Sequence, residues 1–165
     1  MASPPLGRRP PANALSSEEV QTVSVSPRSR PAVILVRSRE NRPVSLADRI
    51  LILLAALCGG GGVGLSAAAA HAAGGANLET AARFMLVHAA AVIGVLALCG
   101  AGLAHPTLGR VAGWTLLLGV ALFAGDLSMR ALRGAALFPM AAPLGGIGLM
   151  IGWGLLAVSG LIPRS

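Results

Sequence analysis

The sequence predicts an all-α membrane protein, an antiparallel four-helix transmembrane bundle that follows a disordered N-terminal tail. Of its 165 residues, 55% are hydrophobic and only 12% are charged, with a mean hydropathy of +0.75. That composition is typical of membrane proteins. Four apolar runs each reach the ~20 residues that a helix needs to cross a bilayer. The short loops between these runs make neighbouring helices antiparallel. The four runs cover about residues 50–73, 78–103, 108–128 and 141–162 of a domain at 47–163.

The tail at residues 1–46 lacks the composition of a folded domain. Seven of the eleven prolines and eight serines fall within the first 45 residues, and apolar residues are too sparse to form a core. Such segments stay disordered because they bury too little apolar surface. A transit peptide and a misassigned start codon are the alternative explanations. Acidic residues in the tail, and arginine without lysine in a chain rich in alanine and glycine, favour a bacterial source.

The first apolar run could also be a cleaved signal peptide, but it is too long for one, and three further spans follow it. We therefore expect an uncleaved helix. Glycines within the runs predict faces where helix backbones approach closely, because small residues four apart form such faces in membranes. The predicted packing positions are Gly60, Gly64, Gly109, Gly113, Gly145, Gly146, Gly148 and Gly152.

The distribution of arginine predicts the orientation. Cationic residues near helix ends concentrate on the cytoplasmic side of a membrane. With the N-terminus inside, six arginines near helix ends are cytoplasmic and three are not, which favours a cytoplasmic N-terminus and C-terminus in a bacterial inner (plasma) membrane. The inner set is Arg37, Arg39, Arg42, Arg49, Arg110 and Arg164, and the outer set is Arg83, Arg130 and Arg133. The net charge of +7 does not indicate nucleic-acid binding, because no basic, aromatic-bearing module lies outside the apolar runs.

Ionisable groups inside a membrane are costly, so each one needs a physical reason. We predict that His88, Asp126 and His71 lie in the outer half of the bundle. His88 either bonds a neighbouring helix and fixes its register, or binds a proton or ligand. Asp126 either pairs with Arg130 four residues later, or faces His88 across the bundle. His71 lies at the outer end of the first run.

No other pattern predicts chemistry. The sequence contains no metalloprotease, phosphate-loop or Ser-His-Asp motif, so we predict no catalytic residue, no metal and no cofactor. A metal held by the two histidines and Asp126 would require all three at bonding distance. Cys58 and Cys99 are expected at similar depth on adjacent helices, where small apolar packing residues are a simpler explanation than a redox pair.

Several segments together resemble a known family. They are Gly64 to Gly75 with His71, Leu78 to Phe84 followed by His88, Leu118 to Gly125, and Pro143 to Gly146 followed by Gly152 and Trp153. This ordered set, within about residues 47–162, resembles the small bacterial membrane proteins of the domain of unknown function 423 family, and is similar to eukaryotic transmembrane protein 256. The resemblance implies a four-helix inner-membrane protein and no settled activity. The chain departs from the family in its long tail and in Asp126 and Arg130.

These observations predict a non-enzymatic packing or interaction protein of the membrane. Its expected partners are membrane lipids, with a homo-oligomer or other membrane proteins as further partners, and no nucleic acid. The alternative is a small proton-linked transporter or ligand-binding protein that uses His88, Asp126 and His71 in an outer polar pocket. An intramembrane enzyme is the third hypothesis.

Overall fold

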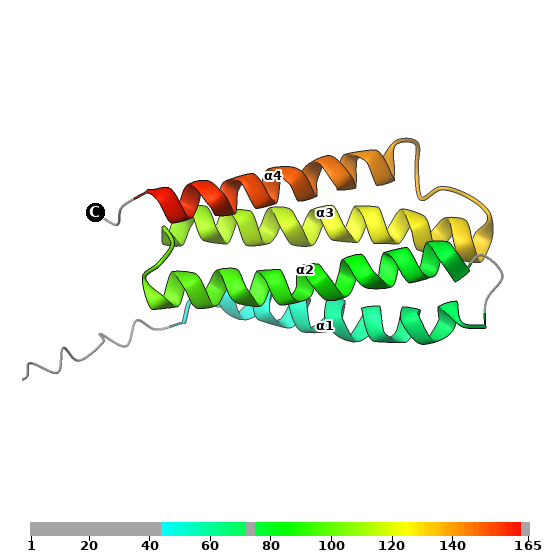
Figure 1. The fold of residues 1–165 in the computed structure, drawn as a ribbon, viewed down its shortest axis with the longest axis horizontal. Coiled ribbons are helices and arrows are strands. Elements are labelled where there is room, and N and C mark those ends of the chain that lie inside the picture. Colours follow the sequence, from blue (N-terminus) through cyan, green and yellow to red (C-terminus); the bar gives the residue numbers. More distant parts are fainter. Residues whose placement is uncertain (1–43, 72–74, 163–165) are drawn as a thin grey trace, which may run out of the picture. The chain divides into compact units, whose positions relative to one another are not determined.

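The computed structural model describes residues 44–71 and 75–162, and it places four α-helices in them (Figure 1). The helices are α1 (Leu46–Ala69), α2 (Gly75–Ala101), α3 (Pro106–Arg133) and α4 (Ala141–Leu161). Each is long and apolar enough to cross a membrane, and the described residues contain no strand. The predicted all-α fold with four spans is therefore confirmed, and the chain is a multi-pass membrane protein. The predicted tail up to residue 43 lies outside the described residues.

Helix α1 begins four residues before the predicted start, because its first turn is charged. Ser45 caps the helix: its hydroxyl accepts a hydrogen bond from the N–H of Asp48, whose carboxylate accepts one from the N–H of Ser45. This reciprocal pair satisfies two of the backbone donors that a helix start leaves unpaired. The Asp48 carboxylate also accepts two hydrogen bonds from the Arg110 guanidinium of α3, at 2.7 and 3.0 Å. One residue thus both starts α1 and ties it to α3.

Helix α3 extends five residues beyond the predicted end at 128. Arg130 and Arg133 lie in its last turn, where cations interact favourably with the negative end of the helix dipole. The helix stops at Gly134, whose φ of 68° lies in the left-handed region that glycine adopts without steric cost. The apolar pattern predicted an end at 128 because two of the next five residues, Arg130 and Arg133, are charged, although the backbone there remains helical.

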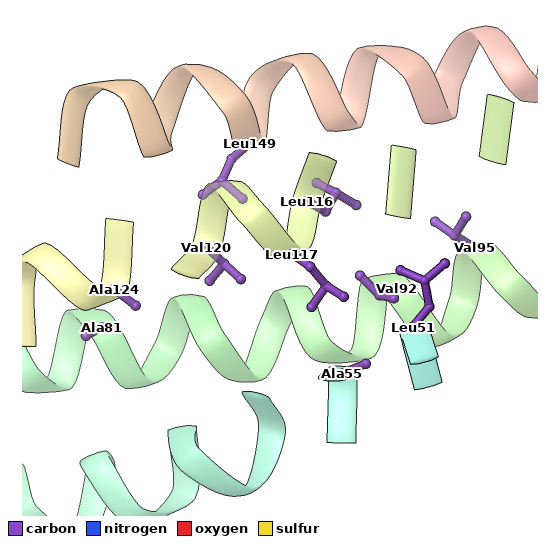
Figure 2. Close-up of a cluster of buried hydrophobic side chains, with 10 residues drawn as sticks. All are labelled: Leu51, Ala55, Ala81, Val92, Val95, Leu116, Leu117, Val120, Ala124 and Leu149. Atoms are coloured by element: carbon purple, nitrogen blue, oxygen red, sulfur yellow. The ribbon is translucent and has the colours of Figure 1, made fainter. Parts of the chain in front are cut away.

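The helices lie in an open row rather than around a closed square. Helix α1 packs on α2, α2 on α3 and α3 on α4, whereas α1 and α4 form no packed interface (Figure 1). One apolar core runs along the row, and α3 contributes most to it (Figure 2). Its buried members are Leu51, Ala55, Ala81, Val92, Val95, Leu116, Leu117, Val120, Ala124 and Leu149. Because α1 and α4 end the row, each has a broad apolar face that none of the other described helices covers.

Five of the eight predicted packing glycines do face a neighbouring helix. Gly145 and Gly152 lie against α3, and Gly148 approaches the backbone of Gly119. A Cβ added at Gly109 would collide with Cys99 Sγ, and one added at Gly113 would lie 3.7 Å from Leu51. Glycine therefore sets the distance of α3 from α2, at Gly109, and from α4, at Gly145, because a methyl group has no room at either position.

The other three predicted glycines require a correction. A Cβ added at Gly60, Gly64 or Gly146 would have no described atom of a neighbouring helix within 4 Å. The buried glycine of α1 is Gly62, which lies against Ala82 and Leu86 of α2. The spacing of glycines reveals a flat face on a helix but not its direction, so Gly60 and Gly64 lie on the uncovered face of α1.

Candidate functional site

The strongest candidate site is an aromatic cluster around His88, which we call the His88 cluster. It comprises Phe84 and His88 of α2, Phe123 of α3 and Trp153 of α4. The ring centroid of Phe84 lies 5.7 Å from that of His88 and 4.5 Å from that of Phe123. The Trp153 ring meets the imidazole edge-on, with centroids 6.1 Å apart. The cluster therefore joins three helices near the middle of α2, far from both helix ends.

Both ring nitrogens of His88 have hydrogen-bond partners, and the imidazole is 5% exposed. Nδ1 lies 2.8 Å from the carbonyl oxygen of Phe84, which can only accept. Nε2 lies 3.3 Å from Nε1 of Trp153, which can only donate. The partners therefore require the neutral tautomer in which Nδ1 carries the proton and Nε2 accepts. A protonated imidazole, with N–H on both nitrogens, could not keep the bond to Trp153.

Asp126 forms a separate site near the end of α3. Its fully buried carboxylate accepts a hydrogen bond from Arg130 Nε at 2.7 Å and another from the backbone N–H of Leu137 at 2.7 Å. The predicted pair with Arg130 is therefore confirmed. The bond to Leu137, in the loop before α4, could not be found from sequence, because no periodic pattern links a helix residue to a loop eleven residues later.

The structure does not bring the three predicted site residues together. Phe84 and Phe123 are in contact, so they lie at one depth. Along the antiparallel helices, His88 lies four residues from Phe84 toward one end of the bundle, and Asp126 lies three residues from Phe123 toward the other end. At a rise of about 1.5 Å per residue, His88 and Asp126 are therefore about 10 Å apart in depth. His71 is exposed and follows the end of α1. We therefore correct the prediction of one outer polar cluster: His88 lies at mid-depth with Trp153, and only Asp126 and His71 lie toward that end.

Polar contacts that were not predicted from the sequence lie at the other end of the helices, where α1 and α3 begin and α4 ends. Besides the Asp48–Arg110 pair, His105 precedes α3, and its backbone N–H donates to the carbonyl oxygen of Ser159 in α4 at 2.8 Å. Arg110 was counted in the sequence only as a charge that sets orientation. The signal that could have found its role is Asp48, the one acidic residue described at the same end of the bundle, since an unpaired charge there would be costly.

Cys58 and Cys99 lie at different depths, contrary to expectation. Cys58 Sγ donates to the carbonyl oxygen of Met85, whereas Cys99 packs against Gly109. Met85 and Cys99 are fourteen residues apart on α2, about 21 Å along its axis. The two cysteines form no disulfide. Across residues 44–71 and 75–162, no three His, Cys, Asp or Glu side chains are placed to hold a metal ion.

Comparison with known proteins identifies the family. Residues 65–146 match the family model described as "Protein of unknown function (DUF423)". The chain belongs to this family. The match runs from the last turns of α1 into the first turns of α4, so this DUF423 protein shares with the family the region that holds His71, His88 and Asp126. Trp153 lies beyond it. No curated protein and no solved structure matched the chain, so the similarity to transmembrane protein 256 stays a prediction.

Proposed function

We propose that this DUF423 protein is a non-enzymatic membrane protein that acts by associating with lipids and with other membrane proteins, including copies of itself. We place it in the bacterial inner membrane with both termini in the cytoplasm. The observation that carries the proposal is the uncovered face of α1. Gly60 and Gly64 lie there with no described atom of a neighbouring helix within 4 Å of an added Cβ, beside Val63, which is 61% exposed. Small residues at this spacing allow close helix association in membranes.

The polar groups support the same proposal. Both ring nitrogens of His88 are hydrogen-bonded, to Phe84 and Trp153. Both carboxylate oxygens of Asp126 accept hydrogen bonds, from Arg130 and Leu137. A nucleophile or general base needs a side chain whose reactive atom can reach a substrate. These groups instead connect helices and a loop of the same chain, which supports a structural role for them.

Photo-crosslinking in native membranes tests the association. A crosslinking amino acid at Val63 is expected to capture protein, and Gly60→Leu with Gly64→Leu should reduce that capture roughly fivefold, the factor that ~1 kcal/mol of helix association represents. The control is the same probe at Leu118 of α3, which is equally exposed at 62%. Its products should not change in the double variant. Capture of lipid alone at Val63 would contradict association through α1.

A proton-linked transporter is the second candidate, and one observation favours it. His88 is a buried titratable group at mid-depth whose bond to Trp153 exists only when the ring is neutral. A proton arriving at Nε2 would break the contact between α2 and α4. Four helices are too few to enclose a transport pathway, so transport would require a homo-oligomer.

Proton flux into sealed vesicles tests this second candidate. If the first proposal holds, vesicles with the purified protein should leak protons no faster than vesicles without it. The transporter hypothesis instead requires protein-dependent flux that His88→Ala abolishes while the variant still folds. Flux that persists in His88→Ala would exclude His88 as the carrier.

A further inference from the structure

The loop between α3 and α4 folds back along α3. Helix α3 ends at Arg133, yet the backbone N–H of Leu137 donates to Asp126, seven residues before that end. Seven residues correspond to about 10 Å along a helix. A Cβ added at Gly125 would also lie 3.7 Å from Leu137 Cδ2, so the loop lies against the side of α3. In Figure 1, α4 accordingly begins well before the level at which α3 ends.

The loop surface is apolar where a water-exposed loop would be polar. Residues 135–140 read Ala-Ala-Leu-Phe-Pro-Met, without a polar side chain. Leu137 is 44% exposed, Phe138 40% and Met140 63%. Loops in water normally carry polar and turn-forming residues, because exposed apolar clusters are costly there. This composition suits contact with hydrocarbon instead.

The charged side chain of Arg133 marks the membrane surface beyond the loop. Arg133 is exposed at the end of α3, whereas the Arg130 guanidinium turns inward to the buried Asp126. Arginines near helix ends extend their guanidinium groups to the headgroups while their stems stay in the apolar region. The loop, which returns about 10 Å inward from Arg133, then lies below the headgroups.

Irregular backbone at that depth needs a partner for its polar groups, because hydrocarbon offers none. Asp126 supplies one for the N–H of Leu137, in a charge-assisted hydrogen bond. Arg130 binds the other carboxylate oxygen and balances its charge. This arrangement explains why a carboxylate is buried seven residues inside α3.

We propose that residues 135–140 form a re-entrant segment that inserts into the leaflet at this end of the protein, with phospholipid acyl chains as its partner and Asp126 as its positioning residue. The proposal rests on the membrane association proposed above and names the element that contacts lipid. Arg133 places the headgroup phosphates over the segment, a charge match that favours lipid over a second copy of the chain.

Fluorescence quenching in vesicles tests the insertion. The full chain with Cys58→Ala and Cys99→Ala receives one cysteine, at Phe138, Leu118 or Glu79, which then carries an environment-sensitive fluorophore. Lipids brominated on their acyl chains should quench the probe at 138 about as strongly as the probe at 118 on the lipid-facing side of α3. The unlabelled cysteine at 138 should also react with an impermeant maleimide far more slowly than the one at Glu79, an exposed residue at the same end.

The outcomes separate this inference from the proposed function. Quenching at 118 but not at 138, with fast maleimide reaction at 138, would overturn the re-entrant segment and leave a membrane protein. Slow maleimide reaction at 138 without quenching would overturn it in favour of a covering protein chain. Absence of quenching at both sites would contradict membrane association itself.

A substitution at Asp126 tests its positioning role. Asp126→Ala removes the acceptor for Leu137, so maleimide labelling at 138 should rise roughly tenfold, the factor expected for a hydrogen bond to a charged acceptor. Asp126→Asn keeps an acceptor oxygen and should leave labelling close to that of the parent. Unchanged quenching at 118 shows that each variant is still folded in the membrane. If 138 stays equally protected in Asp126→Ala, Asp126 does not position the loop.

Discussion

Replacing Gly145 by alanine is expected to destabilise the protein by about 3 kcal/mol, the upper end of the usual cost of overpacking, because the contact is with rigid backbone. The added Cβ would lie 2.5 Å from the backbone nitrogen of Phe123 and 2.8 Å from the carbonyl oxygen of Gly119. Both atoms belong to the backbone of α3, which cannot turn aside as a long side chain can. Helices α3 and α4 would have to separate, and Leu149 and Phe123 would lose contacts in the core.

The neighbouring glycine provides a matched control. Gly146→Ala makes the same chemical change one residue later, but no described atom of a neighbouring helix lies within 4 Å of its Cβ. Its stability should change by no more than about 0.5 kcal/mol, as for substitutions away from packed sites. Equilibrium unfolding of both variants in mixed detergent measures the difference. Equal stability of the two variants would contradict the close α3–α4 approach.

His88→Ala should also cost about 3 kcal/mol, since it combines a core cavity with a donor left without its acceptor in the membrane. The imidazole is 5% exposed, so its removal leaves a void between α2 and α4. Trp153 is 45% exposed on a membrane-spanning helix, where hydrocarbon offers its Nε1 no replacement for the lost acceptor. Thermal unfolding in mild detergent at matched lipid content measures the loss.

A double-mutant cycle with Trp153→Phe separates the hydrogen bond from the cavity. The coupling between the two sites should be about 1 kcal/mol, the size usual for hydrogen bonds between helices in membranes. No coupling would mean that the 3.3 Å contact stabilises nothing. A His88→Ala variant as stable as the parent would mean that His88 is kept at a cost, which is common at functional sites, and would favour the transporter hypothesis.

The elements of the fold could be predicted because their causes are local. A run of apolar residues of membrane-spanning length forms a helix whatever surrounds it, since hydrocarbon leaves the backbone no other partner. The errors at the helix ends have the same origin. Asp48 at the start of α1 and Arg133 at the end of α3 are charged, so hydropathy excluded them, although capping and the helix dipole make both favourable there.

The candidate site was only partly predictable. His88 was singled out because an ionisable group inside a span is rare, and Asp126 was paired with Arg130 because four residues make one helical turn. Trp153 could not be linked to His88, because α2 and α4 are not consecutive helices and no local pattern shows that their side chains meet directly. The loop bond to Leu137 has no signature in the sequence.

The sequence by itself determined that this protein crosses the membrane four times, which residues can lie in its spans, and which family it resembles. Each of these follows from composition and from local order along the chain. Only the tertiary structure decided the rotation of each helix about its axis, and hence that Gly62 rather than Gly60 is packed, and that His88 meets Trp153 instead of Asp126. A helix hydrophobic on every side gives no pattern to mark its inner face, so side-chain packing alone fixes that rotation.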